Sequence, residues 1–119
     1  MEAIGVHHVA IEVTDLDRSL AFYTGTLGLP VLPRPELPIE GAWLGAGPQE
    51  IHLAVVDATE PTRSGHFALR VTDLDQVLVE LRSAGLDARE PVGVGDLARQ
   101  SFVRDPDGNL IELHERADG

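Results

Sequence analysis

Alternation of apolar and polar residues at the start of the chain predicts a half-buried β-strand. Within residues 7–13, Val9, Ile11 and Val13 form an apolar face, and the opposite face begins with His8. This period of two is typical of a strand with one face buried. The apolar residues that follow recur at helical spacing as far as Leu27, and Asp15 or Asp17 can cap the helix that they predict.

The remainder of the first half reads as a proline-rich connection and a hairpin. Residues 32–39 (LPRPELPI) contain three prolines, which favour a loop or a short edge strand. Residues 42–44 and 50–56 predict two strands joined by a turn at 45–48. With a short strand near the proline-rich segment, the order is β-α-β-β-β.

The second half repeats this plan. Its pattern predicts, in chain order, a strand that opens at His66, a helix over 73–84, a short strand near 88–90, and strands over 100–104 and 109–114. The sequence Asp-Pro-Asp-Gly at 105–108 is a strong signal for a reversal between the last two strands. A second β-α-β-β-β module follows.

The halves are also related by an internal repeat. The thirteen residues that start at His8 (HVAIEVTDLDRSL) recur 58 residues later from His66 (HFALRVTDLDQVL), with eight identities. Each half is marginal in size for folding alone. We therefore expect an α+β fold in one domain, 1–119, with a first module at about 1–57 and a second at about 64–115.

Composition excludes several classes of function. The net charge of −11 disfavours nucleic acid and anionic membranes as partners. All nine basic residues are arginine, which excludes lysine Schiff-base chemistry. Cysteine is absent, which leaves histidine and carboxylate as metal ligands. No secretion signal or long apolar run is visible, and we expect a cytoplasmic protein.

Four polar side chains interrupt apolar strands at matched positions: His8, His52, His66 and Glu112. Their apolar neighbours should pack on the helices, which turns each polar side chain to the other face of its sheet. His8 and His66 correspond under the repeat, and His52 and Glu112 each occupy the centre of a closing strand. Approximate two-fold symmetry brings the four together as ligands for a divalent transition metal, with Zn, Ni, Fe, Mn and Co as candidates.

Three segments of the chain resemble the vicinal oxygen chelate superfamily, also called the glyoxalase, bleomycin-resistance and extradiol-dioxygenase fold. They are HVAIEVTDLDRSLAFYTGTLGLPV, GHFALRVTDLDQVLVELRSAG and FVRDPDGNLIEL. The resemblance covers nearly the whole chain. It implies two modules that form a cupped half-barrel around a metal, and a homodimer with its sites at the interface.

The resemblance also implies roles for the four residues. His8, His66 and Glu112 match ligands of the family, whereas His52 falls where glyoxalase I has a glutamate and methylmalonyl-CoA epimerase a glutamine. The implied activity is that of a metal-dependent lyase or isomerase acting on a substrate with two neighbouring oxygens. Glu112, as a metal-bound carboxylate, would transfer a proton between adjacent carbons.

Three alternatives remain at this level. His8, His66 and Glu112 form the ligand triad of an Fe(II) ring-cleaving dioxygenase, although a fourth ligand at His52 would fill a position needed for oxygen. Thiol transfer to an antibiotic requires more cationic groups than this acidic chain offers. A non-catalytic metal-containing binding protein would lack an exchangeable metal position; an enzyme is favoured over it.

Substrate specificity requires further side chains. The candidates for substrate contact are Arg34, Trp43, Arg99 and Gln100. The remaining histidines, His7 and His114, fit the four-ligand pattern less well, and we expect them to be hydrogen-bonded or surface residues and not ligands, although His114 shares the face of Glu112.

Overall fold

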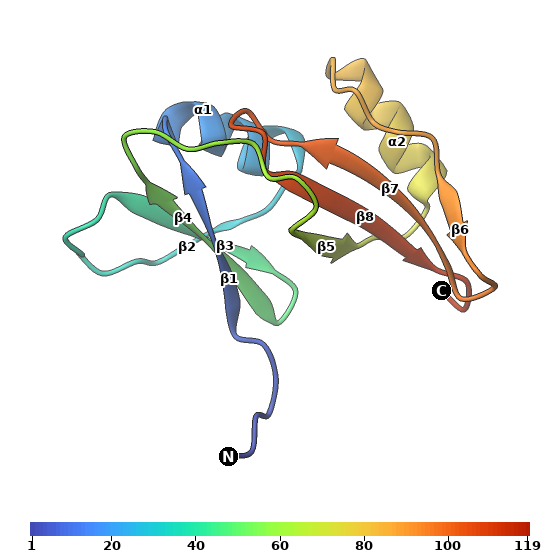
Figure 1. Ribbon diagram of the computed structural model, residues 1–119, viewed down its shortest axis with the longest axis horizontal. Coiled ribbons are helices and arrows are strands. Elements are labelled where there is room, and N and C mark those ends of the chain that lie inside the picture. Colours follow the sequence, from blue (N-terminus) through green and yellow to red (C-terminus); the bar gives the residue numbers. More distant parts are fainter. The chain divides into compact units, whose positions relative to one another are not determined.

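The computed structural model describes residues 1–119 and divides into two compact units, Met1–Glu60 (unit 1) and Pro61–Gly119 (unit 2). Each unit contains one four-stranded sheet and its own helix, and no sheet closes into a barrel (Figure 1). The fold is therefore α+β. The boundary between the units separates the two copies of the sequence repeat.

Unit 1 has the predicted β-α-β-β-β order. Its elements are β1 (His8–Val13), α1 (Leu16–Leu20), the π-helical segment η1 (Ala21–Thr26), β2 (Val31–Leu32), β3 (Gly41–Ala46) and β4 (Gln49–Val55). The strands lie in the order β1-β4-β3-β2. Strand β1 runs parallel to β4, and the other neighbours are antiparallel.

Unit 2 has the same topology. Its elements are β5 (His66–Arg70), α2 (Leu74–Ser83), β6 (Val92–Val94), β7 (Ala98–Arg104) and β8 (Leu110–Arg116). The strand order is β5-β8-β7-β6, with β5 parallel to β8. The two copies of the internal repeat thus fold into two modules with the same topology, as the sequence predicts.

A helix packs on one face of the sheet of unit 2. In unit 2, α2 lies along the sheet (Figure 1), and Leu74, Leu78 and Leu81 of the helix are buried, as are Ile111 and Leu113 of β8. Burying such apolar area is the main source of stability. Because side chains alternate along a strand, Glu112 must point to the opposite face of the sheet. None of the helices has the length and apolar character needed to cross a bilayer.

Both helices start at an aspartate. The Asp15 side chain accepts a hydrogen bond from the backbone N–H of Arg18, and Asp73 does the same for Gln76. The first helix changes from an α-helix to a π-helix after Leu20. Here the Thr24 hydroxyl donates a hydrogen bond to the Leu20 carbonyl oxygen at 2.5 Å. Such local hydrogen bonds compete with regular helical ones. The helix predicted as far as Leu27 therefore finishes as a π-helical turn.

One strand was predicted at the wrong place. The short strand expected near 88–90 is found at Val92–Val94, where it pairs with β7. Arg89 does donate its backbone N–H to the carbonyl oxygen of Phe102. Pro91 has no N–H to offer, so the ladder starts only after it.

The predicted reversal at 105–108 is held by a buried carboxylate. Oδ1 of Asp105 accepts from the backbone N–H groups of Asp107 and Asn109 at 2.9 and 2.8 Å, and Oδ2 accepts from the Asn109 side chain at 2.8 Å. Gly108 completes the turn with φ +88°, a conformation that glycine adopts without strain. This turn fixes the start of β8.

Candidate metal centre

The two ligands predicted in unit 2 lie side by side. His66 opens β5, and Glu112 of β8 pairs in register with Ala68 on the same face of the sheet. Nε2 of His66 lies 3.0 Å from Oε1 of Glu112. The Glu112 side chain is only 11% exposed. Its carboxylate is therefore largely withdrawn from water, and the small side chain of Ala68 leaves space beside it.

The hydrogen bonds of His66 define which of its nitrogens can bind a metal. Nδ1 lies 2.7 Å from the carbonyl oxygen of Ser64, which can only accept, so Nδ1 carries a hydrogen. In the neutral ring, Nε2 then presents its lone pair toward Glu112. An imidazole nitrogen and a carboxylate oxygen are donors that suit a divalent transition ion, and these two residues would hold such an ion from neighbouring strands.

The same environment raises the pKa of His66. The hydrogen bond to the Ser64 carbonyl contributes most, burial opposes it, and the hydrogen bond and negative charge of Glu112 raise the pKa further. The surroundings of His66 therefore favour a positive charge at its Nε2 atom, either a proton or a metal ion. A metal ion and a proton compete for that nitrogen, because a histidine ligand must be deprotonated.

His114 lies in contact with this pair. Its Nδ1 lies 2.9 Å from Oε2 of Glu112, so an imidazole contacts each carboxylate oxygen. A hydrogen bond from Nδ1–H would orient the carboxylate, as partners of metal-binding carboxylates commonly do. The signal in the sequence is the spacing of two residues from Glu112, which places both on one face of β8.

The two ligands predicted in unit 1 form a stack of rings. His8 opens β1 and His52 lies in β4, with ring centroids 3.9 Å apart and planes 13° from parallel. Trp43 of β3 covers the other side of the His52 ring, with a centroid distance of 4.5 Å and an angle of 10°. His52 is therefore held between His8 and Trp43.

Glu50 is a further polar residue of unit 1 that sequence reasoning missed. It lies directly opposite His8 in the register of β1 and β4, and its Oε1 is 2.9 Å from Nε2 of His52. The hydrogen bond to His52 lowers the pKa of Glu50, with smaller contributions from the charges of nearby histidines and an opposing effect of burial. Its position two residues before His52, on the same face of β4, was the available signal.

All five histidines of the chain fall in these two clusters. His7, next to His8 with 2.9 Å between their Nδ1 atoms, joins the cluster of unit 1. Each unit thus carries two of the four predicted ligands. No group of three or more histidine, aspartate or glutamate side chains is already arranged to hold a metal. Whether the four share one ion remains a prediction.

The four candidates for substrate contact are dispersed. Trp43 lies against His52, and Gln100 of β7 pairs in register with His114, on the face of Glu112. Arg99, one residue earlier, faces the other way and pairs with Asp75 of α2 at 2.8 Å and with Glu115 at 3.5 Å. Arg99 is thus bound to carboxylates on the helix side of the sheet, which argues against substrate contact beside Glu112.

Arg34, the fourth candidate, is bound within its own loop. Its Nη2 donates to the carbonyl oxygen of Ile39 at 2.6 Å, and its buried Nε has no hydrogen-bond partner. A guanidinium held in this way is fixed in position. Contact of Arg34 with substrate stays a prediction.

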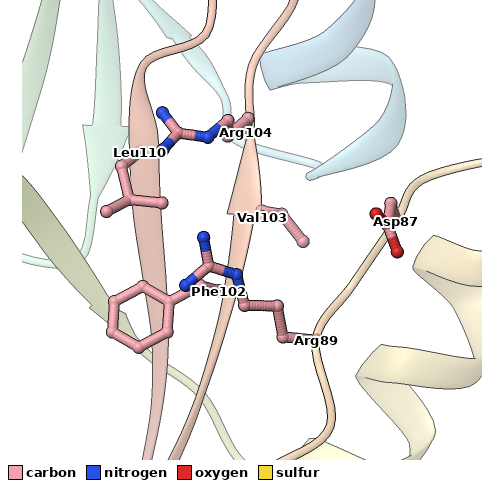
Figure 2. Close-up of a pocket in the computed structure, with 6 residues that line it drawn as sticks. All are labelled: Asp87, Arg89, Phe102, Val103, Arg104 and Leu110. Carbon is pink, nitrogen blue, oxygen red and sulfur yellow. The ribbon is translucent and has the colours of Figure 1, made fainter. Parts of the chain in front are cut away.

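A pocket adjoins the His66–Glu112 pair. Figure 2 shows its lining residues, which enclose about 160 Å³: Asp87, Arg89, Phe102, Val103, Arg104 and Leu110. The Phe102 ring connects the pocket to the pair, because it contacts the His66 ring edge-on at 5.4 Å between centroids. The Arg89 guanidinium lies over the same ring, 5.5 Å from its centroid. An apolar wall with cationic groups thus borders the candidate ligands.

Comparisons with known proteins agree with the observed fold. The family model described as Glyoxalase/Bleomycin resistance protein/Dioxygenase superfamily matches residues 5–113. A lactoylglutathione lyase of Salmonella typhimurium is 34% identical over 93% of this chain and 92% of its own length. One of Arabidopsis thaliana is 36% identical over 92% of this chain, which spans only 43% of that relative. The solved structure of a glyoxalase family protein from Bacillus anthracis superposes with a TM-score of 0.88 at 29% identity, covering 98% of each chain.

Proposed function

Because this chain belongs to the Glyoxalase/Bleomycin resistance protein/Dioxygenase superfamily, we propose that it is a metal-dependent lyase or isomerase of the glyoxalase type. The substrate is a small molecule with two neighbouring oxygens, such as a hemithioacetal or an α-hydroxy carbonyl compound. Relatives named lactoylglutathione lyase, at 34% and 36% identity, support this class of reaction.

The observation that carries the proposal is the geometry of His66 and Glu112. Their facing Nε2 and Oε1 atoms are 3.0 Å apart, and the Ser64 carbonyl orients the imidazole from behind. In the proposed centre these two residues bind a divalent transition ion together with His8 and His52. Nitrogen and oxygen donors of this kind suit Zn, Ni, Fe, Mn or Co.

When bound, the ion supplies Lewis-acid polarisation of the substrate oxygens. Glu112 takes a proton from one substrate carbon and returns it to the next. The low exposure of its side chain strengthens its electrostatic interactions, and the His114 ring holds one of its oxygens in place. Phe102, in contact with His66, provides an apolar wall that keeps water from the reacting carbons.

The proposal includes assembly as a homodimer with its sites at the interface. Each unit supplies two of the four predicted ligands, so a complete centre needs donors from both kinds of unit. Units of about sixty residues bury little apolar surface alone. Sedimentation equilibrium of the metal-loaded protein gives the oligomeric state directly, and a monomer with a full metal content would contradict an interfacial site.

A substrate screen with a matched variant tests the function. Metal-free protein is loaded in turn with Zn, Ni, Fe(II), Mn and Co, then assayed with the hemithioacetal of methylglyoxal and glutathione and with α-hydroxy carbonyl compounds. We expect turnover with at least one metal, and a loss of about 10²- to 10⁴-fold in kcat for Glu112→Gln, the usual contribution of a positioned acid or base.

Glutamine keeps the size and one oxygen of Glu112 but cannot carry the proton. Metal content of the variant is measured beside its activity, so that loss of metal is separated from loss of chemistry. Metal-loaded wild-type protein that turns over none of these compounds would refute the proposed reaction, as would an unchanged kcat for the variant.

A further inference from the structure

The stacked rings of unit 1 limit which histidines can bind one metal. A histidine nitrogen directs its lone pair in the plane of the ring. The planes of His8 and His52 are nearly parallel, at 13°, and their centroids are 3.9 Å apart with the rings stacked face to face. Rings stacked in this way direct their lone pairs outward in two nearly parallel planes, so the two rings as they stand do not both direct a lone pair at the same ion.

His52 is the more constrained of the two. It is sandwiched between His8 and Trp43, its side chain is 14% exposed, and its Nε2 is already engaged by Glu50 at 2.9 Å. His8, at the outer side of the stack and at the start of β1, is exposed. His8 can therefore turn toward an ion without breaking the stack of His52 on Trp43.

Glu50 offers the donor that β4 otherwise lacks. It lies directly opposite His8 across the β1–β4 ladder, whereas the residue opposite His66 in unit 2 is Leu110. Its side chain is 27% exposed, more than that of His52. An ionised carboxylate is a good ligand for divalent ions.

We propose that Glu50, and not His52, is the donor that β4 contributes to the metal, and that His52 is a positioning residue whose Nε2–H holds the Glu50 carboxylate. The inference rests on the proposed function. It changes the ligands of the proposed metal centre from three imidazoles and one carboxylate to two imidazoles and two carboxylates. The set becomes His8, Glu50, His66 and Glu112. Two carboxylates neutralise the charge of a divalent ion and favour harder ions such as Mn or Fe(II) over Zn.

The test counts the imidazoles on the metal. Wild-type protein is loaded with one equivalent of Cu²⁺, and the nitrogen couplings are counted by pulsed electron paramagnetic resonance. We expect two imidazoles in the wild type and two again in His52→Phe, which keeps a flat ring between His8 and Trp43. Three imidazoles in the wild type, falling to two in His52→Phe, would overturn the inference and leave the proposed function standing.

Chelator competition with Mn²⁺ provides a second, independent readout. Glu50→Gln should lose more than about tenfold in metal affinity. His52→Phe should lose less, and His52→Gln, which retains an N–H donor for Glu50, should recover most of that loss. Residues that hydrogen-bond a metal ligand commonly change metal affinity by 10- to 100-fold. The order of the three variants in metal affinity therefore decides between the two assignments. Wild-type protein that binds neither ion in stoichiometric amount would refute the proposed function together with this inference.

Discussion

At the scale of single residues, the arginines show that the same type of side chain makes different contacts on the two faces of a sheet. Arg99 and Gln100 are neighbours in sequence, yet strand alternation sends them to opposite faces of β7. Arg99 meets Asp75 and Glu115 on the helix side, whereas Arg89 lies over the ring of Phe102 at the pocket. A basic residue in an acidic chain is therefore informative only when its face of the sheet is known.

The Asp75–Arg99 pair should give stability a defined pH dependence. The hydrogen bond and charge of Arg99 lower the pKa of Asp75. A carboxyl group with a lowered folded-state pKa stabilises above its unfolded value, about 3.9, and this contribution is lost as the pH falls through the folded pKa. Asp75→Asn should therefore lower the free energy of unfolding at pH 7 but have little effect near pH 2.

Urea unfolding of both proteins at several pH values measures this difference. Arg99→Gln serves as the control, because Asp75→Asn should have a smaller effect in that background. The pair is exposed, so the effect is small and should shrink in high salt. A difference between wild type and Asp75→Asn that grows on acidification would exclude this explanation.

At the scale of elements, the reversal before β8 sets the position of Glu112. Gly108 has φ +88°, and a Cβ added there would lie 2.8 Å from Cβ of Pro61. Gly95 has φ +52° in the turn before β7, with nothing within 4 Å of an added Cβ. Both glycines have a positive φ, and only Gly108 has a close contact for an added Cβ, so the two can be compared within unit 2.

We expect Gly95→Ala to cost about 1 kcal/mol of stability from the positive φ alone. Gly108→Ala should cost about 1–3 kcal/mol more, because Pro61 must move. Thermal and urea unfolding measure both values. Equal losses for the two variants would show that the contact with Pro61 does not constrain the turn.

Much of the element order could be predicted from the sequence, and the failures have local causes. Apolar alternation and the repeat identify both β-α-β-β-β modules, and the Asp-Pro-Asp-Gly sequence identifies the last turn. The strand near 88–90 was misplaced because Pro91 interrupts the ladder, which is a hydrogen-bonding effect rather than a pattern effect.

The candidate site was predictable only in part. Repeat symmetry selects His8, His66 and Glu112, but the roles of Glu50 and His114 depend on contacts two residues along a strand. A count of apolar neighbours does not distinguish them from solvent-exposed residues. The stacking of His52 on Trp43 depends on the register of β3 and β4, which no single-strand pattern specifies.

At the scale of the whole molecule, the essential question is whether the two units serve one centre. A ligand that binds only the folded protein raises its stability, by about 2.7 kcal/mol at a hundred times its Kd. We expect Mn²⁺ or Zn²⁺ to raise the Tm of the wild type. Both His8→Ala in unit 1 and His66→Ala in unit 2 should abolish the increase.

Differential scanning calorimetry with and without metal checks this expectation. His7→Ala, next to His8 but outside the proposed ligand set, is the control and should retain the shift. A shift that persists in His8→Ala but disappears in His66→Ala would show that unit 2 binds an ion by itself.

The gathering of every imidazole into two clusters makes the chain convenient for magnetic resonance. Labelling histidine alone with ¹⁵N yields only five ring systems, His7, His8, His52, His66 and His114, and none is distant from the candidate ligands. One long-range ¹H–¹⁵N spectrum would thus show the tautomer of each histidine ring and its response to metal binding and to substrate binding, without signals from other residue types.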